Sequence, residues 1–433
     1  MSLSHLAALL TPDARYVLAF SGGLDSTVLL HQLVCWQQQH PQLHLRALHV
    51  HHGLSPNADG WAAHCQQICQ QWGIPLAVLP VQVDGREQGI EAAAREVRYQ
   101  ALFQQLQPGE CLLTAQHLDD QCETLLLALK RGSGPAGLAG MPAQRSLGEK
   151  QHLRPLLGIS RQQLEAWAAE HQLSWIEDES NADCRYDRNF LRQRVIPELQ
   201  ARWPHFSAAA ARSATLCGEQ EQLLNELLAE QLTQLTDEQG RLTFTSLLSM
   251  SEARRHALLR RWIAGQGGAM PSRDALLRIT REVMQSREDA QPCLSFGAFE
   301  LRRYRQHLYW LPPQVSLSQH LLTWDDRSRP LQLPDQLGEL QACPEVPQLR
   351  FPAADEQVSV RFQAQGYFHL QGRTGGREMK KLWQEAGIPP WQRERIPLIY
   401  YNQTLICAPG LFITREGAAS NEQGWQAIWL KQQ

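Results

Sequence analysis

Residues 21–26 read SGGLDS and separate an apolar run, YVLAF at 16–20, from a run with helical periodicity, TVLLHQLVCW at 27–36. This pattern predicts a buried strand, a tight loop and a helix. The two adjacent glycines allow an anion to approach the unpaired N–H groups at the helix start, and two serine hydroxyls add donors. The predicted ligand is a phosphate, and the residues expected to bind it are Ser21, Gly22, Gly23, Leu24, Asp25 and Ser26.

Asp25 makes this loop informative, because its carboxylate would repel a bare phosphate. A divalent cation or an amine must then lie between the two groups. The alternative is an ordinary glycine-rich turn in which Asp25 or Ser26 caps the helix. No GKS or GKT follows a glycine at the spacing of a Walker motif, so no second phosphate loop of that kind competes.

The first half of the chain alternates strands and helices. Further strands are predicted at 45–50, 76–83 and 111–115, and further helices at 59–72, 90–106 and about 120–130. Such a repeat predicts an α/β fold with a doubly wound, mostly parallel sheet, whose ligands bind beyond the carboxyl ends of the strands. Residues 21–26, 49–54 and 116–120 all lie at that edge.

Three acids follow the last of these strands in the stretch HLDDQCET at 117–124. Asp119 and Asp120 are adjacent at a helix start, and Glu123 lies one turn further on. Beside a phosphate loop, these carboxylates suit Mg²⁺ or the ammonium of an amine substrate. The alternative is helix capping, with Glu123 as the partner in a capping box.

A glycine-rich stretch at 130–140 contains GxGxxG, but it follows a helix instead of a strand and has a proline inside it. We therefore reject a dinucleotide site. Lys130 and Arg131 flank the stretch, which indicates a mobile loop that closes over the reaction centre or contacts a polyanion. An ordinary surface loop is the alternative.

Composition narrows the class of protein. The 433 residues are 43% hydrophobic and 20% charged, and the length is enough for two to four domains. The net charge of −3 indicates that the molecule as a whole is not a nucleic-acid binder, although local basic patches can be, and we expect no DNA partner. No apolar run approaches the roughly 20 residues that span a bilayer, so we expect a cytoplasmic protein without a membrane partner. The ten cysteines include no CxxC pair, which argues against a zinc ribbon or cluster-dependent thiolation.

The SGGxDS loop resembles the signature of the N-type ATP pyrophosphatases, the PP-loop superfamily. With HVHHGL (49–54), EAAAREVRY (91–99), HLDDQCETLL (117–126) and KRGSGPAGLAGM (130–141), the chain is similar to the tRNA(Ile)-lysidine synthetase family over residues 1 to about 200. The resemblance implies a Rossmann-like catalytic domain at 1–205 that uses ATP and Mg²⁺. Its expected substrates are L-lysine and a tRNA(Ile) bearing a CAU anticodon.

The implied reaction adenylates the C2 oxygen of the wobble cytidine, releases pyrophosphate, and lets a lysine amine displace AMP. The catalytic candidates are Asp25, Asp119, Asp120 and Glu123, with Asp25 and Asp119 as metal candidates. Spacing alone does not decide which acid binds magnesium and which meets lysine.

Two arginine pairs are candidates for substrate binding. Arg95 and Arg98 share a helical face, so they bind phosphate or pair with Glu91. Arg188 and Arg192 belong to an active-site lid that contacts RNA or to a solvated helical face, and the resemblance favours the lid.

Two later domains are expected to bind tRNA. A long helix at 206–235 leads into a mainly helical domain, 206–310, where residues 254–305 hold eleven arginines and five acids. After a proline-marked linker comes a small α+β domain at 335–433, with strands at 358–362, 398–401 and 405–408. Lys380, Lys381 and Arg393 lie there beside Trp383 and Trp391, a mixture that suits RNA, although Trp383 equally suits a core position.

Three other classes of protein are alternatives. An amidotransferase would need a nucleophilic cysteine, yet residue 2 is serine, and a tRNA thiolase would need a cysteine pair, whereas Cys122 stands alone near the site. An RNA-binding protein with a decayed nucleotide site is the third class, and an ATP-turnover assay would identify it. Monomer and homodimer both remain open.

Overall fold

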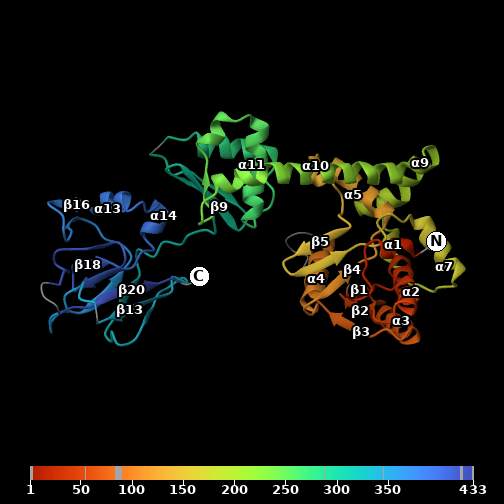
Figure 1. Ribbon diagram of the computed structural model, residues 1–433, viewed down its shortest axis with the longest axis horizontal. Helices are drawn as coiled ribbons and strands as arrows, with labels where there is room; N and C mark the ends of the chain where they lie inside the picture. Colours follow the sequence, from red (N-terminus) through yellow and green to blue (C-terminus); the bar gives the residue numbers. More distant parts are fainter. Residues whose placement is uncertain are drawn as a thin grey trace. The chain divides into compact units, whose positions relative to one another are not determined.

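The chain forms two compact units, Met1–Leu227 and Leu228–Gln433, which we describe separately (Figure 1). The structure is a computed structural model that describes residues 3–53, 55–82, 90–287, 289–344, 346–419 and 423–431, with side chains left out at 90–92 and 180. Helix α10 (Phe206–Leu235) begins in the first unit and ends in the second. We propose a finer division into domains at 206–310 and 335–433.

A six-stranded sheet with the order β3-β2-β1-β4-β6-β5 forms the middle of the first unit. Strands β1, β2, β3, β4 and β6 pair in parallel, and β5 is antiparallel at one edge. The predicted doubly wound α/β fold is therefore confirmed. The strands are β1 (Arg15–Ala19), β2 (His44–His51), β3 (Leu76–Pro80), β4 (Glu110–Leu113), β5 (Gln144–Leu147) and β6 (Lys150–Leu153).

Helices cover both faces of this sheet, because side chains alternate along each buried strand. Leu18 belongs to a core with residues of α2, α3 and α7, whereas Val17 packs on the other face with Leu102 of α4. The helices of this unit are α1 (Ser4–Ala7), α2 (Leu24–Gln39), α3 (Ala58–Gln71), α4 (Ile90–Gln104), α5 (Leu118–Lys130), α6 (Pro135–Leu138), α7 (Arg161–Glu170), α8 (Asp187–Phe190) and α9 (Ile196–Arg202).

The predicted strands and helices of the βα repeat are present, with two differences. Strand β3 ends at Pro80, before the expected 83, and Val83 lies outside the described residues. The hairpin of β5 and β6 was not predicted, because its short strands are rich in polar residues. Among the described residues, no helix is both long and apolar enough to cross a membrane.

The second unit combines helices with antiparallel sheets. After α10, strands β7-β10-β9-β8 form one sheet, accompanied by α11 (Glu252–Gly265) and α12 (Arg273–Arg278). This sheet was not predicted. Its strands are β7 (Leu242–Thr243), β8 (Cys293–Phe296), β9 (Phe299–Tyr304) and β10 (His307–Leu311).

The rest of the second unit confirms the predicted α+β character, with sheets β11-β14-β17-β18-β19, β12-β13-β20 and β15-β16. Two short helices, α13 (Met379–Glu385) and α14 (Pro390–Arg393), accompany them. Trp383 is a core residue. The strands are β11 (Leu321–Thr323), β12 (Leu331–Gln332), β13 (Glu339–Cys343), β14 (Val358–Arg361), β15 (Tyr367–His369), β16 (Gly376–Glu378), β17 (Leu398–Tyr401), β18 (Thr404–Ala408), β19 (Phe412–Ile413) and β20 (Gln426–Leu430).

Candidate active site

The predicted phosphate loop lies between the carboxyl end of β1 and the start of α2. Gly22 has a φ of +82°, and a Cβ atom there would lie 2.7 Å from Ile176 Cδ1 and 2.8 Å from Cys65 Sγ. Any larger residue would therefore meet both backbone strain and a steric clash. The first predicted glycine is required by the shape of the loop itself.

The start of α2 has the features of an anion site. Its N-cap, Gly23, provides no side-chain cap, so the first N–H groups of the helix remain available to a ligand. Ser21 Oγ and Ser26 Oγ lie 3.0 Å apart, and Ser26 Oγ donates to Gly23 O at 3.0 Å. These bonds shape the loop and keep both hydroxyls beside the helix end.

His117 organises the acids at the start of α5. Its ring caps the helix by accepting a hydrogen bond from Asp119 N at Nδ1 (3.2 Å), while His117 N donates to Asp120 Oδ2 (3.0 Å). Capping by His117 and Asp120 together was not predicted, since the expected box used Glu123. Because Nδ1 accepts, the ring proton of neutral His117 is on Nε2.

That Nε2 faces two of the predicted catalytic acids. It lies 3.7 Å from Asp25 Oδ2 and 3.5 Å from Asp120 Oδ2. His117 is completely buried, and Nε2 has no hydrogen-bond partner among the described residues. A buried polar atom without a partner is uncommon and often marks a functional position. His117 thus brings the acid of the phosphate loop and the acids of α5 to one point.

Two arginines form ion pairs with the acids of α5. Arg192 contacts both oxygens of Glu123, at 2.6 and 3.1 Å, and Asp120 Oδ1 at 3.0 Å. Arg188 Nε lies 3.3 Å from Glu123 Oε2. Burial raises the pKa of the Glu123 carboxyl, and the two guanidinium groups oppose that rise. The predicted lid arginines therefore meet active-site carboxylates in this structure, and their contact with RNA stays a prediction.

Arg192 belongs to an unusual piece of helix. Residues Leu191–Val195 form a π-helical turn between α8 and α9. Such turns are rare and occur preferentially at functional sites. Arg192 lies in this turn, and Arg188 lies in α8 directly before it.

Asp119, like Asp120 and Glu123, has both carboxylate oxygens bonded. Its Oδ2 accepts from Arg161 N at 2.8 Å and its Oδ1 accepts from Gln200 Nε2 at 3.1 Å. Arg161 also reaches Asp25 Oδ1 with Nη1, at 3.5 Å. Neither Arg161 nor Gln200 was predicted, since nothing in their local sequence links them to residues 119 or 25.

Asp25 has weaker contacts and remains partly exposed at 29% of its side chain. Burial raises the pKa of its carboxyl, while His117 and Arg161 lower it. A hard cation such as Mg²⁺ is commonly held by one or two carboxylates and substrate phosphates. Asp25 fits that role, whereas both Asp119 oxygens already accept hydrogen bonds. The described residues include no cluster of three or more metal-ligating side chains.

The glycine-rich stretch is tied to α5 at its far end. The Gln121 amide donates to Met141 O and accepts from Met141 N, both at 2.7 Å. Lys130 pairs with Asp187 Oδ2 at 2.6 Å on an exposed surface, and Arg131 is exposed. Neither predicted substrate-binding cation touches the acid cluster in this structure.

The remaining predicted substrate residues lie elsewhere. Arg95 is exposed, and its guanidinium carbon is 5.2 Å from the ring centroid of Tyr99. The side chain of Glu91, its alternative partner, lies outside the described residues. In the second unit Lys380 and Lys381 are exposed, and Arg393 Nε donates to Ile388 O at 3.2 Å.

Three family models match the chain. A PP-loop domain matches residues 2–199, a TilS substrate binding domain matches 242–309, and a TilS substrate C-terminal domain matches 358–429. The chain is 56% identical over 431 residues to the tRNA(Ile)-lysidine synthase of Shigella flexneri, covering 100% of this chain and 99% of that relative.

A second relative with the same name matches the chain over its full length. The tRNA(Ile)-lysidine synthase of Salmonella typhimurium is 54% identical over 429 residues, which cover 99% of this chain and 100% of the relative. Among solved structures, the U34-tRNA thiolase NcsA from Methanococcus maripaludis aligns with a TM-score of 0.42 at 15% identity, over 48% of this chain and 74% of that one. That structural likeness is too weak to bear on function.

Proposed function

The chain belongs to the tRNA(Ile)-lysidine synthase family, and from that premise we propose that it ligates L-lysine to C2 of the wobble cytidine of tRNA(Ile) with a CAU anticodon. The observation that carries the proposal is the meeting of Asp25 and Asp120 at His117 Nε2, beside the loop at the start of α2. This arrangement supports a phosphate site beside paired carboxylates at one sheet edge. ATP and lysine would be used in a cytoplasmic enzyme.

The first step is adenylation of the base. The cytidine O2 attacks the α phosphorus of ATP, the bond to the bridging oxygen breaks, and pyrophosphate leaves toward Ser21–Ser26. The N-terminal N–H groups of α2 would stabilise the leaving charge. Asp25 would hold Mg²⁺, which when bound neutralises charge on the phosphates. We infer that Asp119, fixed by Arg161 and Gln200, positions the start of α5 instead of binding metal.

The second step needs a neutral amine. A lysine ammonium would first give a proton to one of the candidate carboxylates, and its neutral nitrogen would then attack C2. The bond from C2 to the AMP oxygen breaks, AMP leaves, and the nitrogen loses its second proton to solvent. We assign the ammonium to Asp120 and Glu123, whose negative charges are balanced by Arg188 and Arg192 in this structure. His117 Nε2 would keep Asp25 and Asp120 oriented during both steps.

Selection of the tRNA is assigned to the second unit. Its two parts match family models for substrate domains, and exposed cations suit a phosphate backbone. Removing the residues after about 215 should spare ATP binding and abolish selective tRNA modification. Unchanged selectivity in the shortened protein would contradict this assignment.

The decisive experiment measures incorporation of labelled lysine into unmodified tRNA(Ile) with a CAU anticodon, with and without ATP, while following AMP and ADP. We expect lysine in the RNA and an equal amount of AMP. AMP without lysine transfer would preserve the adenylation step and point to another nucleophile. RNA binding without nucleotide turnover would contradict the ligase and favour a binding protein.

A further inference from the structure

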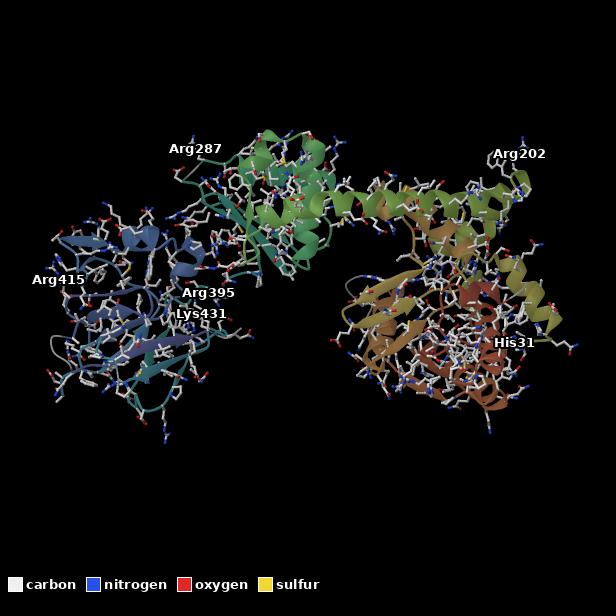
Figure 2. The ribbon with its side chains drawn as sticks, in the orientation of Figure 1. His31, Arg202, Arg287, Arg395, Arg415 and Lys431 are labelled. Carbon is white, nitrogen blue, oxygen red and sulfur yellow. The ribbon has the colours of Figure 1, made fainter. Side chains whose placement is uncertain are left out.

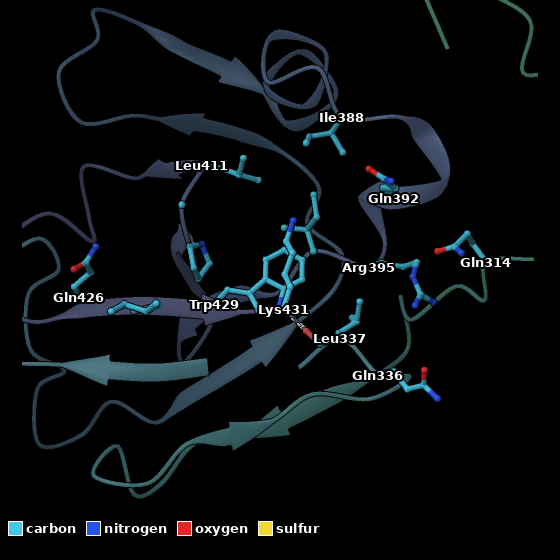
Figure 3. Close-up of a pocket in the computed structure, with 15 residues that line it drawn as sticks. Gln314, Gln336, Leu337, Ile388, Gln392, Arg395, Leu411, Gln426, Trp429 and Lys431 are labelled. Carbon is cyan, nitrogen blue, oxygen red and sulfur yellow. Dashed lines mark hydrogen bonds between the residues drawn. The ribbon is translucent and has the colours of Figure 1, made fainter. Parts of the chain in front are cut away.

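A cavity of about 520 Å³ lies in the second unit, beside β20 and the 409–411 turn (Figure 3). Its volume is within the roughly 300–1,000 Å³ typical of small-molecule sites. Ile388 and Arg395, which flank α14, and Gln314 and Leu337, from earlier in this unit, also line it. The cavity is therefore assembled from several segments of one unit.

The lining combines apolar and polar side chains. Leu337, Ile388 and Leu411 are among the apolar ones, and the polar amides and cations belong to Gln314, Gln336, Gln392, Gln426, Arg395 and Lys431. Among the described lining residues none is acidic and none is a histidine or cysteine, which argues against a metal ion or a cationic ligand. The lining suits an anion with a flat, hydrogen-bonding body.

Trp429 supplies a fixed aromatic surface. Its indole Nε1 donates to Leu337 O at 2.7 Å, which holds the ring in place, and Lys431 Nζ lies 4.6 Å from the ring centroid. In Figure 3 the Lys431 side chain lies across the tryptophan. Lys431 is exposed and long, so its ammonium can move from the ring to a phosphate when a base stacks on the indole.

The polar lining residues offer groups that can hydrogen-bond the edge of a base. No described protein group hydrogen-bonds the side-chain amides of Gln336, Gln392 or Gln426, and each amide offers both a donor and an acceptor. Arg395 is held by Asp335 Oδ2 at 2.6 Å, which offsets part of its charge. Figure 2 shows Arg395 and Lys431 in the same part of the unit.

We propose that this cavity binds one unpaired nucleotide of the tRNA substrate, from the single-stranded 3′ end. The proposal rests on the proposed function, because it takes tRNA as the substrate. Only an unpaired nucleotide exposes both the face of its base to Trp429 and its edge to the glutamines. The 3′ end of a tRNA supplies such nucleotides together with their phosphates.

The test compares two transcripts of tRNA(Ile) with a CAU anticodon, one complete and one without its last three nucleotides. Filter binding at a fixed salt concentration measures the Kd of each for the full-length protein. We expect the truncation to weaken binding roughly tenfold, as loss of a stacked base does. The double variant Gln392→Ala, Lys431→Ala should weaken binding of the complete transcript by a similar factor and of the truncated one less than about twofold.

The control variant is Gln365→Ala, which removes an exposed glutamine outside the cavity. It should leave both Kd values unchanged. A double variant that weakens both transcripts equally, or neither, would overturn the proposal. Lysine incorporation by the parent protein is measured separately, and its absence would contradict the proposed function. The two Kd values alone decide whether the cavity binds the nucleotide.

Discussion

Two acids of α5 in the first unit are buried and paired, whereas two lysines of α13 in the second unit are exposed. In the first, Glu123 is completely buried and Asp120 nearly so, and both are bonded to Arg192. In the second, Lys380 and Lys381 are exposed to solvent. Fixed, partly desolvated charges can act on a reacting atom without reorganising, whereas exposed cations exchange counterions for phosphates. Substitutions should therefore impair chemistry and stability in the first unit, and salt-dependent affinity in the second.

The largest effect should follow Asp25→Asn, which preserves shape and removes the charge. We expect the rate of lysine transfer to fall roughly 1,000-fold, with tRNA affinity unchanged, because we propose that Asp25 acts on the reacting phosphate through Mg²⁺. Steady-state incorporation of labelled lysine measures it. Asp13→Asn, an exposed acid before the amino end of β1, is the matched control. Full turnover by Asp25→Asn would refute the role of this carboxylate.

Arg192→Ala tests the buried ion pair directly. It leaves Glu123 with Arg188 as its remaining cationic partner, so the free energy of unfolding should fall by about 2–4 kcal/mol. Urea titration of the full-length protein measures the change. Arg185→Ala breaks a comparable pair with Asp183 in which the arginine side chain is 87% exposed, and should change little. Equal losses in the two variants would remove the contrast between buried and exposed pairs.

In the second unit, the substitutions Lys380→Ala and Lys381→Ala should each weaken tRNA binding only a few-fold. Each should also reduce the slope of log K against log salt by about 1, because one phosphate contact is lost. Binding isotherms at several salt concentrations give that slope. Gln384→Ala, an uncharged change on the same helix α13, should leave it unaltered. An unchanged slope in both lysine variants would exclude them from the tRNA contact.

The smallest effect concerns pH. Burial raises the pKa of Asp25 in the folded protein, so the folded state holds a proton that the unfolded state has already lost. The contribution of the Asp25 carboxyl to the free energy of unfolding is therefore lost as the pH rises from the ordinary aspartate pKa of about 3.9 through the pKa of Asp25 in the folded protein. Asp25→Asn should be slightly more stable than its parent at pH 7, with the difference vanishing near pH 3. A difference that grows as pH falls would contradict this sign.

Local patterns in the sequence predicted much of the catalytic unit. The βα repeat, the loop at 21–26 and the acids at 119–123 follow from short-range periodicity and from the rule that parallel strands share a ligand-binding edge. In the second unit, three of the predicted strands match β14, β17 and β18. These features depend on residues that are close together in the sequence, so local patterns reveal them.

The missed residues depend on distant partners. Arg161 meets Asp25 across 136 positions, and Gln200 meets Asp119 across 81, so no local pattern reveals either contact. Trp391 was predicted to face RNA, yet it is half-buried against Tyr309, with ring centroids 5.1 Å apart. Whether an aromatic side chain is covered depends on segments that spacing does not locate.

The enclosure of Gly22 has a consequence for synthesis of the protein on the ribosome. Ile176 N donates to Gly22 O at 2.9 Å, and the Ile176 side chain packs where a Cβ of residue 22 would be. The nucleotide loop is thus completed by a segment translated about 150 residues later. A nascent chain released before that segment should bind ATP poorly, so nucleotide binding should report that the entire catalytic unit has emerged and folded.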